Sequence, residues 1–275
     1  MTGRPTDPPA WVLDLDGVIW RGTHTVAGAP EAVATIRKRG DRVVFVTNSS
    51  ARTRSQVAAK LARHGVPDTE PLVVTAAMAA ARLVVPGERV LACGGDGVID
   101  ELRRRDVELV SRGPADAVVV GIRDDFDYEM LTAVMRAVRG GARLIGTNDD
   151  PTFPDETGLK PGNGALVAAA ATAGGVDAIV AGKPHEPMVE LVRGRLGSRG
   201  VVVGDRPDTD GRFALELGYE FALVLSGVTS SDDLPVQPAP HTVVDDLGSL
   251  VSPHRSTESD GGSRRGDGTR WAPGW

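Results

Sequence analysis

Short apolar runs that read as buried strands alternate with helical patterns along most of this chain, and this alternation limits the fold more than any other feature. Neighbouring parallel strands need a long crossover between them, and a helix usually supplies it. The alternation therefore predicts an α/β fold built on a parallel sheet. Outside the segments described below, the pattern predicts helices at 28–39, 52–64, 127–138 and 163–173, and strands at 89–93, 117–121 and 143–147.

Two carboxylates, Asp14 and Asp16, come directly after the apolar run 11–13, and Gly17 follows them. A residue and its second neighbour on a strand point the same way, so both carboxylates can reach one cavity beyond the carboxyl end of that strand. Open α/β sheets bind their ligands at this end of their strands. Taken alone, the segment is equally consistent with a strand that ends in an ordinary Asp-Gly turn.

Three later apolar runs also end in polar segments. The runs VVFV, AIVA and VVV are followed by TNSS, GKP and GDRPDTD. If these runs belong to one parallel sheet, their carboxyl ends meet at one edge, and the polar groups that follow share one site. The side chains that could carry chemistry there are Thr47, Asn48, Lys183, Asp205 and Asp210.

Some of these polar groups also have a purely structural interpretation. Thr47 and Asn48 could cap the helix that is expected to begin near Arg52. Asp208 is assigned to the N-terminus of the helix through 213–215, where the helix dipole stabilises a carboxylate. Residue type alone does not decide between a structural and a chemical role for these groups. The chemical role is favoured because the other groups are all expected at one edge of the sheet.

In chain order, DLDGVIW, TNSS, GKP and GDRPDTD resemble the four motifs of the haloacid dehalogenase (HAD) superfamily. The DxDG start, the GDRxxTD ending and the long insert between the second and third motifs are most similar to the type IIA phosphatases. That branch contains the NagD-like, phosphoglycolate and glycerol-phosphate phosphatases. The resemblance extends over 11–250. Four motifs in a fixed order are specific for the superfamily, but none of them identifies the substrate.

The resemblance implies a phosphatase and a role for each matched residue. Asp14 would be the nucleophile that forms an aspartyl-phosphate intermediate. Asp16 would be the general acid that protonates the leaving alkoxide, and then the base that activates water. Lys183 would neutralise charge on Asp14 and on the phosphoryl oxygens. Thr47 and the backbone around Asn48 would donate hydrogen bonds to the transferring group.

The same resemblance implies Mg²⁺ as the cofactor. Mg²⁺ prefers octahedral oxygen ligands and keeps several waters. The side chain of Asp14, the backbone carbonyl of Asp16 and the side chain of Asp205 would supply the protein ligands. Asp210 would orient a metal-bound water or Lys183 from outside that shell.

Between the second and third motifs, the alternation of strands and helices continues over a long insert. We expect a second folded unit there, and the resemblance makes it an α/β cap domain of the C2 type on a Rossmann-like HAD core. Such a cap closes over the active site and contacts the part of the substrate beyond its phosphate. The expected divisions are a flexible N-terminus at 1–10, the core at 11–76 and 179–250, the cap at 77–178 and a disordered tail at 251–275.

Within the cap, the segment 146–151 is a polar turn after an apolar strand. Asn148 and Asp149 in this turn are candidates to accept hydrogen bonds from substrate hydroxyls. An ordinary turn explains both residues equally well.

Aromatic side chains make up only 4% of the chain. The cap holds Phe126, Tyr128 and Phe153, so a stacking platform for nucleotide bases is poorly supplied. We therefore expect a small hydroxylated phosphate ester, with glycerol 3-phosphate preferred and 2-phosphoglycolate next, ahead of nucleotides and sugar phosphates. Two other classes are a non-catalytic sensor of phosphorylated metabolites and a phosphotransferase that passes the phosphoryl group to an alcohol. A sensor has no need of Asp16 as a proton donor.

The formal net charge of −6 argues against broad nucleic-acid binding. No apolar run approaches the roughly 20 residues of a membrane span, and 1–10 is too short and proline-rich for a secretory signal, so we expect a cytoplasmic protein without a membrane partner. The single cysteine, Cys93, excludes an internal disulfide and reads as a buried strand thiol. Caps of this type often contribute to dimer contacts in the family, so the resemblance allows a homodimer.

Overall fold

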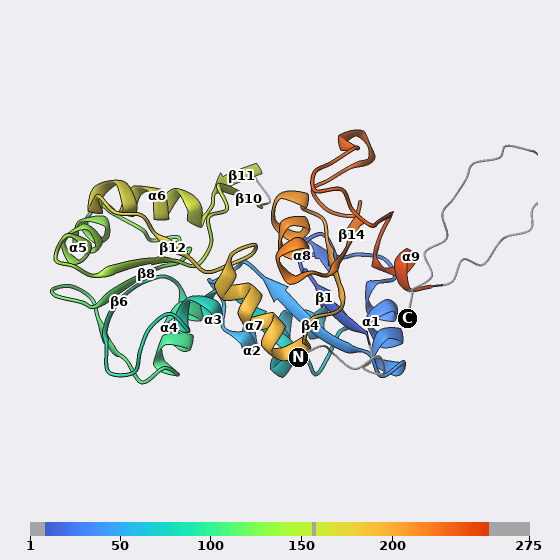
Figure 1. Cartoon of the computed structure of the whole chain (residues 1–275), viewed down its shortest axis with the longest axis horizontal. Coiled ribbons are helices and arrows are strands. Elements are labelled where there is room, and N and C mark those ends of the chain that lie inside the picture. Colours follow the sequence, from blue (N-terminus) through green and yellow to red (C-terminus); the bar gives the residue numbers. More distant parts are fainter. Residues whose placement is uncertain (1–8, 156–157, 253–275) are drawn as a thin grey trace, which may run out of the picture.

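Two parallel β-sheets lie towards opposite ends of an elongated molecule (Figure 1). The computed structural model describes residues 9–155 and 158–252. The first sheet has the strand order β15-β14-β13-β1-β4-β5, and each neighbouring pair is parallel. Its strands are β1 (Ala10–Leu13), β4 (Arg42–Thr47), β5 (Val73–Thr75), β13 (Val201–Gly204), β14 (Glu220–Val224) and β15 (Thr242–Val244).

Helices cover both faces of this sheet because its strands are apolar on both sides. In β4, Val44 and Val46 pack into one apolar cluster, whereas Val43 and Phe45 pack into another. Successive side chains of a strand point to opposite faces, which produces this division. The first cluster includes α3 (Ala76–Ala81), α7 (Glu186–Leu196) and α8 (Arg212–Leu217), and the second includes α1 (Ala29–Lys38), α2 (Arg54–Arg63) and α9 (Leu247–Val251).

The second sheet has five parallel strands in the order β12-β9-β8-β6-β7. The helices α5 (Tyr128–Arg139) and α6 (Asn163–Gly174) pack on one face. On the other face, α4 (Asp96–Arg103) joins the apolar cluster that continues through α3 into the first sheet. The strands are β6 (Arg89–Cys93), β7 (Glu108–Val110), β8 (Ala117–Val120), β9 (Arg143–Gly146) and β12 (Ile179–Val180).

The predicted α/β fold with parallel sheets is confirmed, and α1, α2, α5 and α6 begin and end within two residues of the predicted helices. One strand lies in a different sheet from the one expected. The division before residue 179 assigns β12 to the first unit, but Ile179 pairs with Ile145 in the second sheet. The amide of Ala181 donates to the carbonyl of Gly146 at 2.9 Å, which extends this pairing beyond the strand.

Several short elements are not predicted by the sequence pattern, since two to five residues are too few to show a period. A hairpin of β2 (Trp20–Arg21) and β3 (His24–Thr25) follows the first motif. A second hairpin pairs β10 (Thr152–Asp155) with β11 (Gly158–Pro161). The remaining short elements are the 3₁₀ turns Glu70–Leu72 and Ser231–Asp233 and the π-helical turn Pro207–Gly211.

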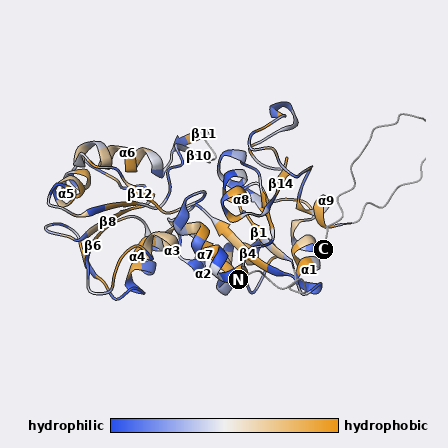
Figure 2. Cartoon of the chain, in the orientation of Figure 1, coloured by the Kyte–Doolittle hydropathy of each residue, from blue (hydrophilic) through white to orange (hydrophobic). Residues whose placement is uncertain are grey.

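Apolar residues are concentrated in the strands, as the hydrophobic colouring of β1 and β4 in Figure 2 shows. Cys93 is buried in β6, as predicted, and burial raises the pKa of its thiol to about 11.

The helices α5 and α6 have 12 residues each. Within 9–155 and 158–252, no helix combines the length and the apolar character of a membrane span.

Candidate active site

The polar motifs meet at the carboxyl ends of three neighbouring strands. Asp14 follows β1, Thr47 ends β4 and Asp205 follows β13. Because β13, β1 and β4 are adjacent and parallel, the strand order brings these residues to one edge of the sheet. Lys183 arrives by another route, because it lies in the connection between β12 of the second sheet and α7.

Lys183 is a buried cation that joins two carboxylates. Its Nζ donates hydrogen bonds of 2.6 Å to Oδ1 of Asp14 and 2.6 Å to Oδ1 of Asp210. The side chains of Lys183 and Asp210 are only 5% and 1% exposed, so water screens this contact little. Burial alone would lower the pKa of Lys183, but Asp14 and Asp210 raise it above its ordinary value. Lys183 is therefore protonated at neutral pH.

Three carboxylates crowd around this lysine. Asp14, Asp205 and Asp210 each place an oxygen within 4.8 Å of the others. Burial raises the pKa of Asp14 well above its usual range, and repulsion from the other two carboxylates adds to this rise against the attraction of Lys183. Burial, followed by repulsion from Asp210, raises the pKa of Asp205 to about 7. One lysine thus leaves the group with an excess of negative charge when all three carboxylates are ionised.

The chemistry of this group fits a small divalent cation. Carboxylate oxygens are the ligands that Mg²⁺ prefers, and a divalent charge offsets the repulsion between them. Asp14 and Asp205 are two of the predicted ligands. Asp210, predicted to act from outside the shell, lies close enough to belong to the same group. Asp16 adds no side-chain oxygen to the group, which is compatible with a ligand role for its backbone carbonyl alone.

Asp16 lies at the exposed edge of the site, and its carboxylate is held by an aromatic residue. Nε1 of Trp20 donates a 2.7 Å hydrogen bond to Oδ1 of Asp16. The backbones of the two residues also form an isolated parallel bridge. Trp20 is not among the predicted site residues, although it is an aromatic residue four positions after Asp16 in DLDGVIW.

A loop after β14 holds Asp205 in place. The amide of Val228 donates to Oδ2 of Asp205 at 2.6 Å, and Oγ1 of Thr229 donates to the Asp205 carbonyl at 2.6 Å. A Cβ on Gly227 would collide with the Asp205 carboxylate, and so would one on Gly17, whose φ of +81° also favours glycine. This loop is not among the predicted site segments, although small polar residues follow an apolar run there, as they do in the other motifs.

Asn48 lies beside Lys183, and neither Thr47 nor Asn48 caps α2. Thr53 caps α2 instead, so the capping interpretation is wrong. Oγ1 of Thr47 accepts a 3.0 Å bond from the amide of Ser49, which leaves the hydroxyl hydrogen for another acceptor. Oδ1 of Asn48 accepts from the Lys183 amide at 2.8 Å, and Nδ2 donates to the Lys183 carbonyl at 3.1 Å. The Asn48 side chain therefore fixes the backbone of Lys183.

The predicted cap residues lie in a segment that contacts the first sheet. Asn148 is 4% exposed, and its Nδ2 donates to the Asn48 carbonyl at 2.7 Å, which favours a positioning role over a substrate contact. Asp149 keeps a 49% exposed side chain and pairs with Nε2 of His185 at 2.9 Å. Asp150, which the sequence analysis misses, accepts from Nδ2 of Asn48 at 3.1 Å and lies 3.7 Å from Arg206.

Asp208 does not join the site. Its exposed carboxylate pairs with the guanidinium of Arg206 at 3.0 Å within the π-helical turn before α8. The prediction of a structural role for Asp208 therefore agrees with its position.

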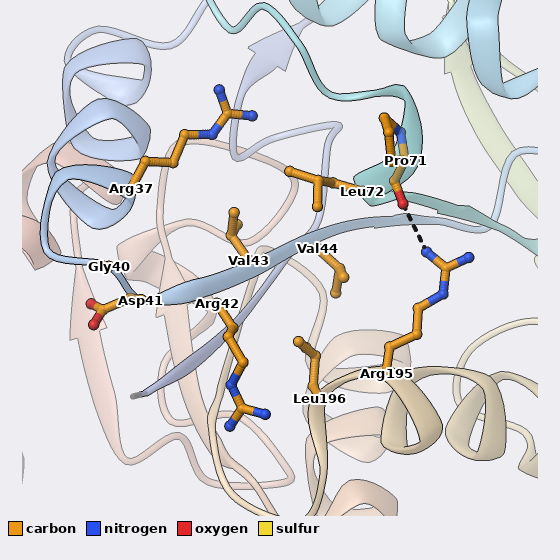
Figure 3. A pocket seen from close by; sticks show the side chains of 10 residues that line it. All are labelled: Arg37, Gly40, Asp41, Arg42, Val43, Val44, Pro71, Leu72, Arg195 and Leu196. Atoms are coloured by element: carbon orange, nitrogen blue, oxygen red, sulfur yellow. Dashed lines mark hydrogen bonds between the residues drawn. The ribbon is translucent and has the colours of Figure 1, made fainter. Parts of the chain in front are cut away.

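A cavity of about 420 Å³ lies at the amino end of β4, the end opposite to Thr47 (Figure 3). Nη1 of Arg195 donates to the carbonyl of Pro71 at 3.1 Å across its rim. None of the predicted site residues lines it, so the chemistry is assigned to the carboxylate group and not to this cavity. Its lining residues are Arg37, Gly40, Asp41, Arg42, Val43, Val44, Pro71, Leu72, Arg195 and Leu196.

Two family models match the chain, and the first of them extends into the insert. The model described as haloacid dehalogenase-like hydrolase matches residues 11–108. The model described as HAD-hydrolase-like matches residues 180–250. The two matches together contain all the motif residues that meet at the site.

Curated relatives with phosphatase names align with most of the chain. The 5′-nucleotidase YutF of Bacillus subtilis is 36% identical over 230 residues, which are 82% of this chain and 90% of that protein. The D-glycerol 3-phosphate phosphatase of Mycobacterium tuberculosis is 38% identical over 229 residues, which are 81% of this chain and 64% of that longer protein. An acid sugar phosphatase of Staphylococcus saprophyticus is 31% identical, with 85% of this chain and 92% of that protein covered.

Solved structures share the fold and the sequence. The p-nitrophenyl phosphatase from Archaeoglobus fulgidus superposes with a TM-score of 0.84 at 32% identity, over 89% of this chain and 98% of that chain. The glycerol phosphate phosphatase from Mycobacterium tuberculosis in complex with magnesium superposes with a TM-score of 0.82 at 36% identity, over 89% of this chain and 77% of that chain. This chain therefore belongs to the haloacid dehalogenase superfamily, in its type IIA branch of phosphatases.

Proposed function

We propose that this chain is a Mg²⁺-dependent phosphomonoesterase that hydrolyses a small phosphorylated metabolite through an aspartyl-phosphate on Asp14. The observation that carries the proposal is the position of Lys183, whose Nζ lies 2.6 Å from carboxylate oxygens of both Asp14 and Asp210. A buried ammonium and a bound divalent cation together favour the ionised form of Asp14, which is the nucleophilic form.

The reaction has two halves, transfer of the phosphoryl group to Asp14 and its hydrolysis, and Asp16 moves a proton in each. Asp14 attacks phosphorus while the bond from phosphorus to the ester oxygen breaks. Asp16 protonates that oxygen, because an unprotonated alkoxide is a poor leaving group. Asp16 then takes a proton from water, and water displaces inorganic phosphate from Asp14. Lys183, the hydroxyl of Thr47 and the backbone at 48 stabilise charge on the phosphoryl oxygens.

The side chains of Asp14 and Asp205 and the carbonyl of Asp16 would hold Mg²⁺, with Asp210 beside them. When bound, Mg²⁺ supplies charge neutralisation for the transferring phosphoryl group. The excess negative charge of the carboxylate group supports this assignment.

Glycerol 3-phosphate is the preferred ester in this proposal, followed by 2-phosphoglycolate. The Mycobacterium tuberculosis relative is named for D-glycerol 3-phosphate. Tyr128 is 84% exposed at the start of α5, and Phe126 packs against the apolar core of the second sheet, so neither supports base stacking. The half-exposed Asp149 is the stronger candidate to accept a hydrogen bond from a substrate hydroxyl. Nucleotides and sugar phosphates stay alternatives, since YutF and the acid sugar phosphatase are named for them.

The test is phosphate release with Mg²⁺ from glycerol 3-phosphate, 2-phosphoglycolate, sugar phosphates and nucleoside monophosphates. Asp14→Asn, which keeps the size of the side chain and removes the nucleophile, serves as the matched blank. The proposal expects Mg²⁺-dependent release, highest for glycerol 3-phosphate and absent in the variant. Release at the wild-type rate by Asp14→Asn would remove Asp14 as the nucleophile.

The same panel of esters also tests the sensor and the phosphotransferase, with melting temperature and product analysis as added measurements. A sensor releases no phosphate from any ester, yet a ligand still raises its melting temperature. A phosphotransferase makes a new phosphate ester when a competing alcohol is added. Product analysis with and without the alcohol therefore distinguishes transfer from hydrolysis.

A further inference from the structure

The indole of Trp20 is fixed within the hairpin that follows the first motif. The residue is 2% exposed, and Nζ of Lys60 lies 4.0 Å from its ring centroid. The ring of His64 lies 5.1 Å away, and its Nδ1 is 2.7 Å from Oγ1 of Thr25 in the same hairpin. The carbonyl of Trp20 accepts a 2.7 Å bond from the amide of Gly17. These contacts hold the indole N–H in one direction.

That direction is the carboxylate of Asp16. The hydrogen bond from Nε1 of Trp20 to Oδ1 of Asp16 is 2.7 Å long, which is short for an indole donor. Asp16 is itself exposed, so packing alone does not fix its side chain. Asp14, two residues earlier, belongs to the carboxylate group that fits a cation. A freely rotating Asp16 could turn towards that cation, and a carboxylate bound to a cation cannot donate a proton.

We propose that Trp20 is a positioning residue, whose indole N–H holds the Asp16 carboxylate away from the cation site and aimed at the leaving oxygen. This inference rests on the proposed function, because it concerns the proton that Asp16 gives up. In that step the bond from phosphorus to the ester oxygen breaks, the bond from phosphorus to Asp14 forms, and the proton of Asp16 moves to the leaving oxygen.

Alkyl and aryl phosphates differ in how much they need the proton of Asp16. An alkyl phosphate such as glycerol 3-phosphate needs the proton, since its leaving alkoxide is strongly basic. An aryl phosphate such as p-nitrophenyl phosphate loses a stable phenolate and needs little help. Loss of the Trp20 N–H should therefore slow attack on alkyl esters more than attack on aryl esters, whereas general damage to the site would slow both alike.

The test compares kcat/KM for p-nitrophenyl phosphate and for the best alkyl ester, in the wild type and in Trp20→Phe, with Mg²⁺. kcat/KM covers the steps up to the first irreversible one, so it reports the transfer to Asp14. We expect the alkyl value to fall about tenfold more than the aryl value, a part of the roughly 10²–10⁴-fold contribution of a general acid.

The chain supplies a matched control in β1. Trp11 is 4% exposed, and its Nε1 donates a 3.2 Å bond to Oδ2 of Asp41. Trp11→Phe removes the same kind of hydrogen bond beside the amino end of β4, the end opposite to Thr47, and should leave the ratio of the two kcat/KM values unchanged.

Equal losses for both esters in Trp20→Phe, or no loss, would overturn the inference while the enzyme remains a phosphatase. A wild type that hydrolyses neither ester would overturn the proposed function, and this inference with it. If Trp20→Phe does not fold, replacement of Trp20 by 3-benzothienylalanine keeps the bicyclic ring and removes only the N–H, and the same ratio decides.

Discussion

Lys183 shares its charge between the buried carboxylate of Asp210 and the partly buried carboxylate of Asp14, and Asp205 lies beside them without a lysine of its own. Two consequences follow at the scale of the residue. The group should bind a divalent cation with a gain in stability, and the protein without a cation should be sensitive to pH. Both consequences can be measured without any substrate.

Mg²⁺ should raise the melting temperature of the wild type and not that of Asp205→Asn. A ligand that binds only the folded state at a hundredfold excess over its Kd adds about 2.7 kcal/mol. The variant loses one ligand charge, although its amide oxygen can still accept the Val228 amide. Thermal unfolding with and without Mg²⁺ measures the difference. An equal rise in both proteins would exclude Asp205 from the metal site.

In metal-free buffer with a chelator, the wild type should lose stability as the pH rises from about 4 to about 7. Burial and Asp210 raise the pKa of Asp205 in the folded state to about 7, from an ordinary value of 3.8. The folded state therefore holds this proton more firmly than the unfolded state, so the contribution is full below the ordinary pKa and is lost as the pH passes through about 7. Melting curves across this window should show a shallower slope for Asp205→Asn. The same slope in both proteins would contradict the assignment.

At the scale of the element, α3 explains how the two sheets share one apolar cluster. Each of its residues, Ala76–Ala81, is buried, and five of the six are alanine. Small side chains let the helix contact α4 of the second sheet and α7 of the first. The sequence does not predict this helix, because six consecutive apolar residues show no helical period.

Ala79→Leu should destabilise the protein by about 1–3 kcal/mol, because added methylenes in a packed core force neighbouring groups apart. Ala62→Leu on the exposed face of α2 is the control and should change the free energy of unfolding by less than about 0.5 kcal/mol. Urea unfolding of both variants measures the difference. A neutral Ala79→Leu would show that the space between the sheets is not tightly packed.

At the scale of the whole molecule, the second sheet takes part in building the site. Lys183 comes from the connection after β12, and Asn48 links it to Asp150 in the segment after β9. Movement of the second sheet would therefore also move the groups around Asp14. The cap boundaries at 77–178 stay a prediction, as does the homodimer, which light scattering of the full chain would test.

Much of the fold and part of the site can be predicted from this sequence. Asp14, Thr47 and Asp205 follow clear apolar runs, so their meeting at one sheet edge could be expected, and the family resemblance adds Lys183 to them. The membership of β12 in the second sheet could not, since a strand of two residues has no pattern. The engagement of Asn148 with Asn48 could not either, because a hydrogen bond between residues 100 positions apart leaves no local signal.

The expected disordered tail at 251–275 lies almost wholly outside the described residues, which end at 252. Of this segment, the structure describes Val251 and Ser252. Val251 ends α9, where its carbonyl accepts a 3.1 Å bond from the guanidinium of Arg39.

The measurement that tests the central claim most directly is a burst experiment with p-nitrophenyl phosphate and the Asp16→Asn variant. This substrate needs no proton for its leaving group, so the first half of the reaction should proceed, but the variant lacks the base that activates water. We predict a burst of one p-nitrophenolate per active site, followed by slow turnover, with a phosphoryl group on the peptide that contains Asp14 after acid quenching. Steady turnover without a burst, or a phosphoryl group on another residue, would contradict the account.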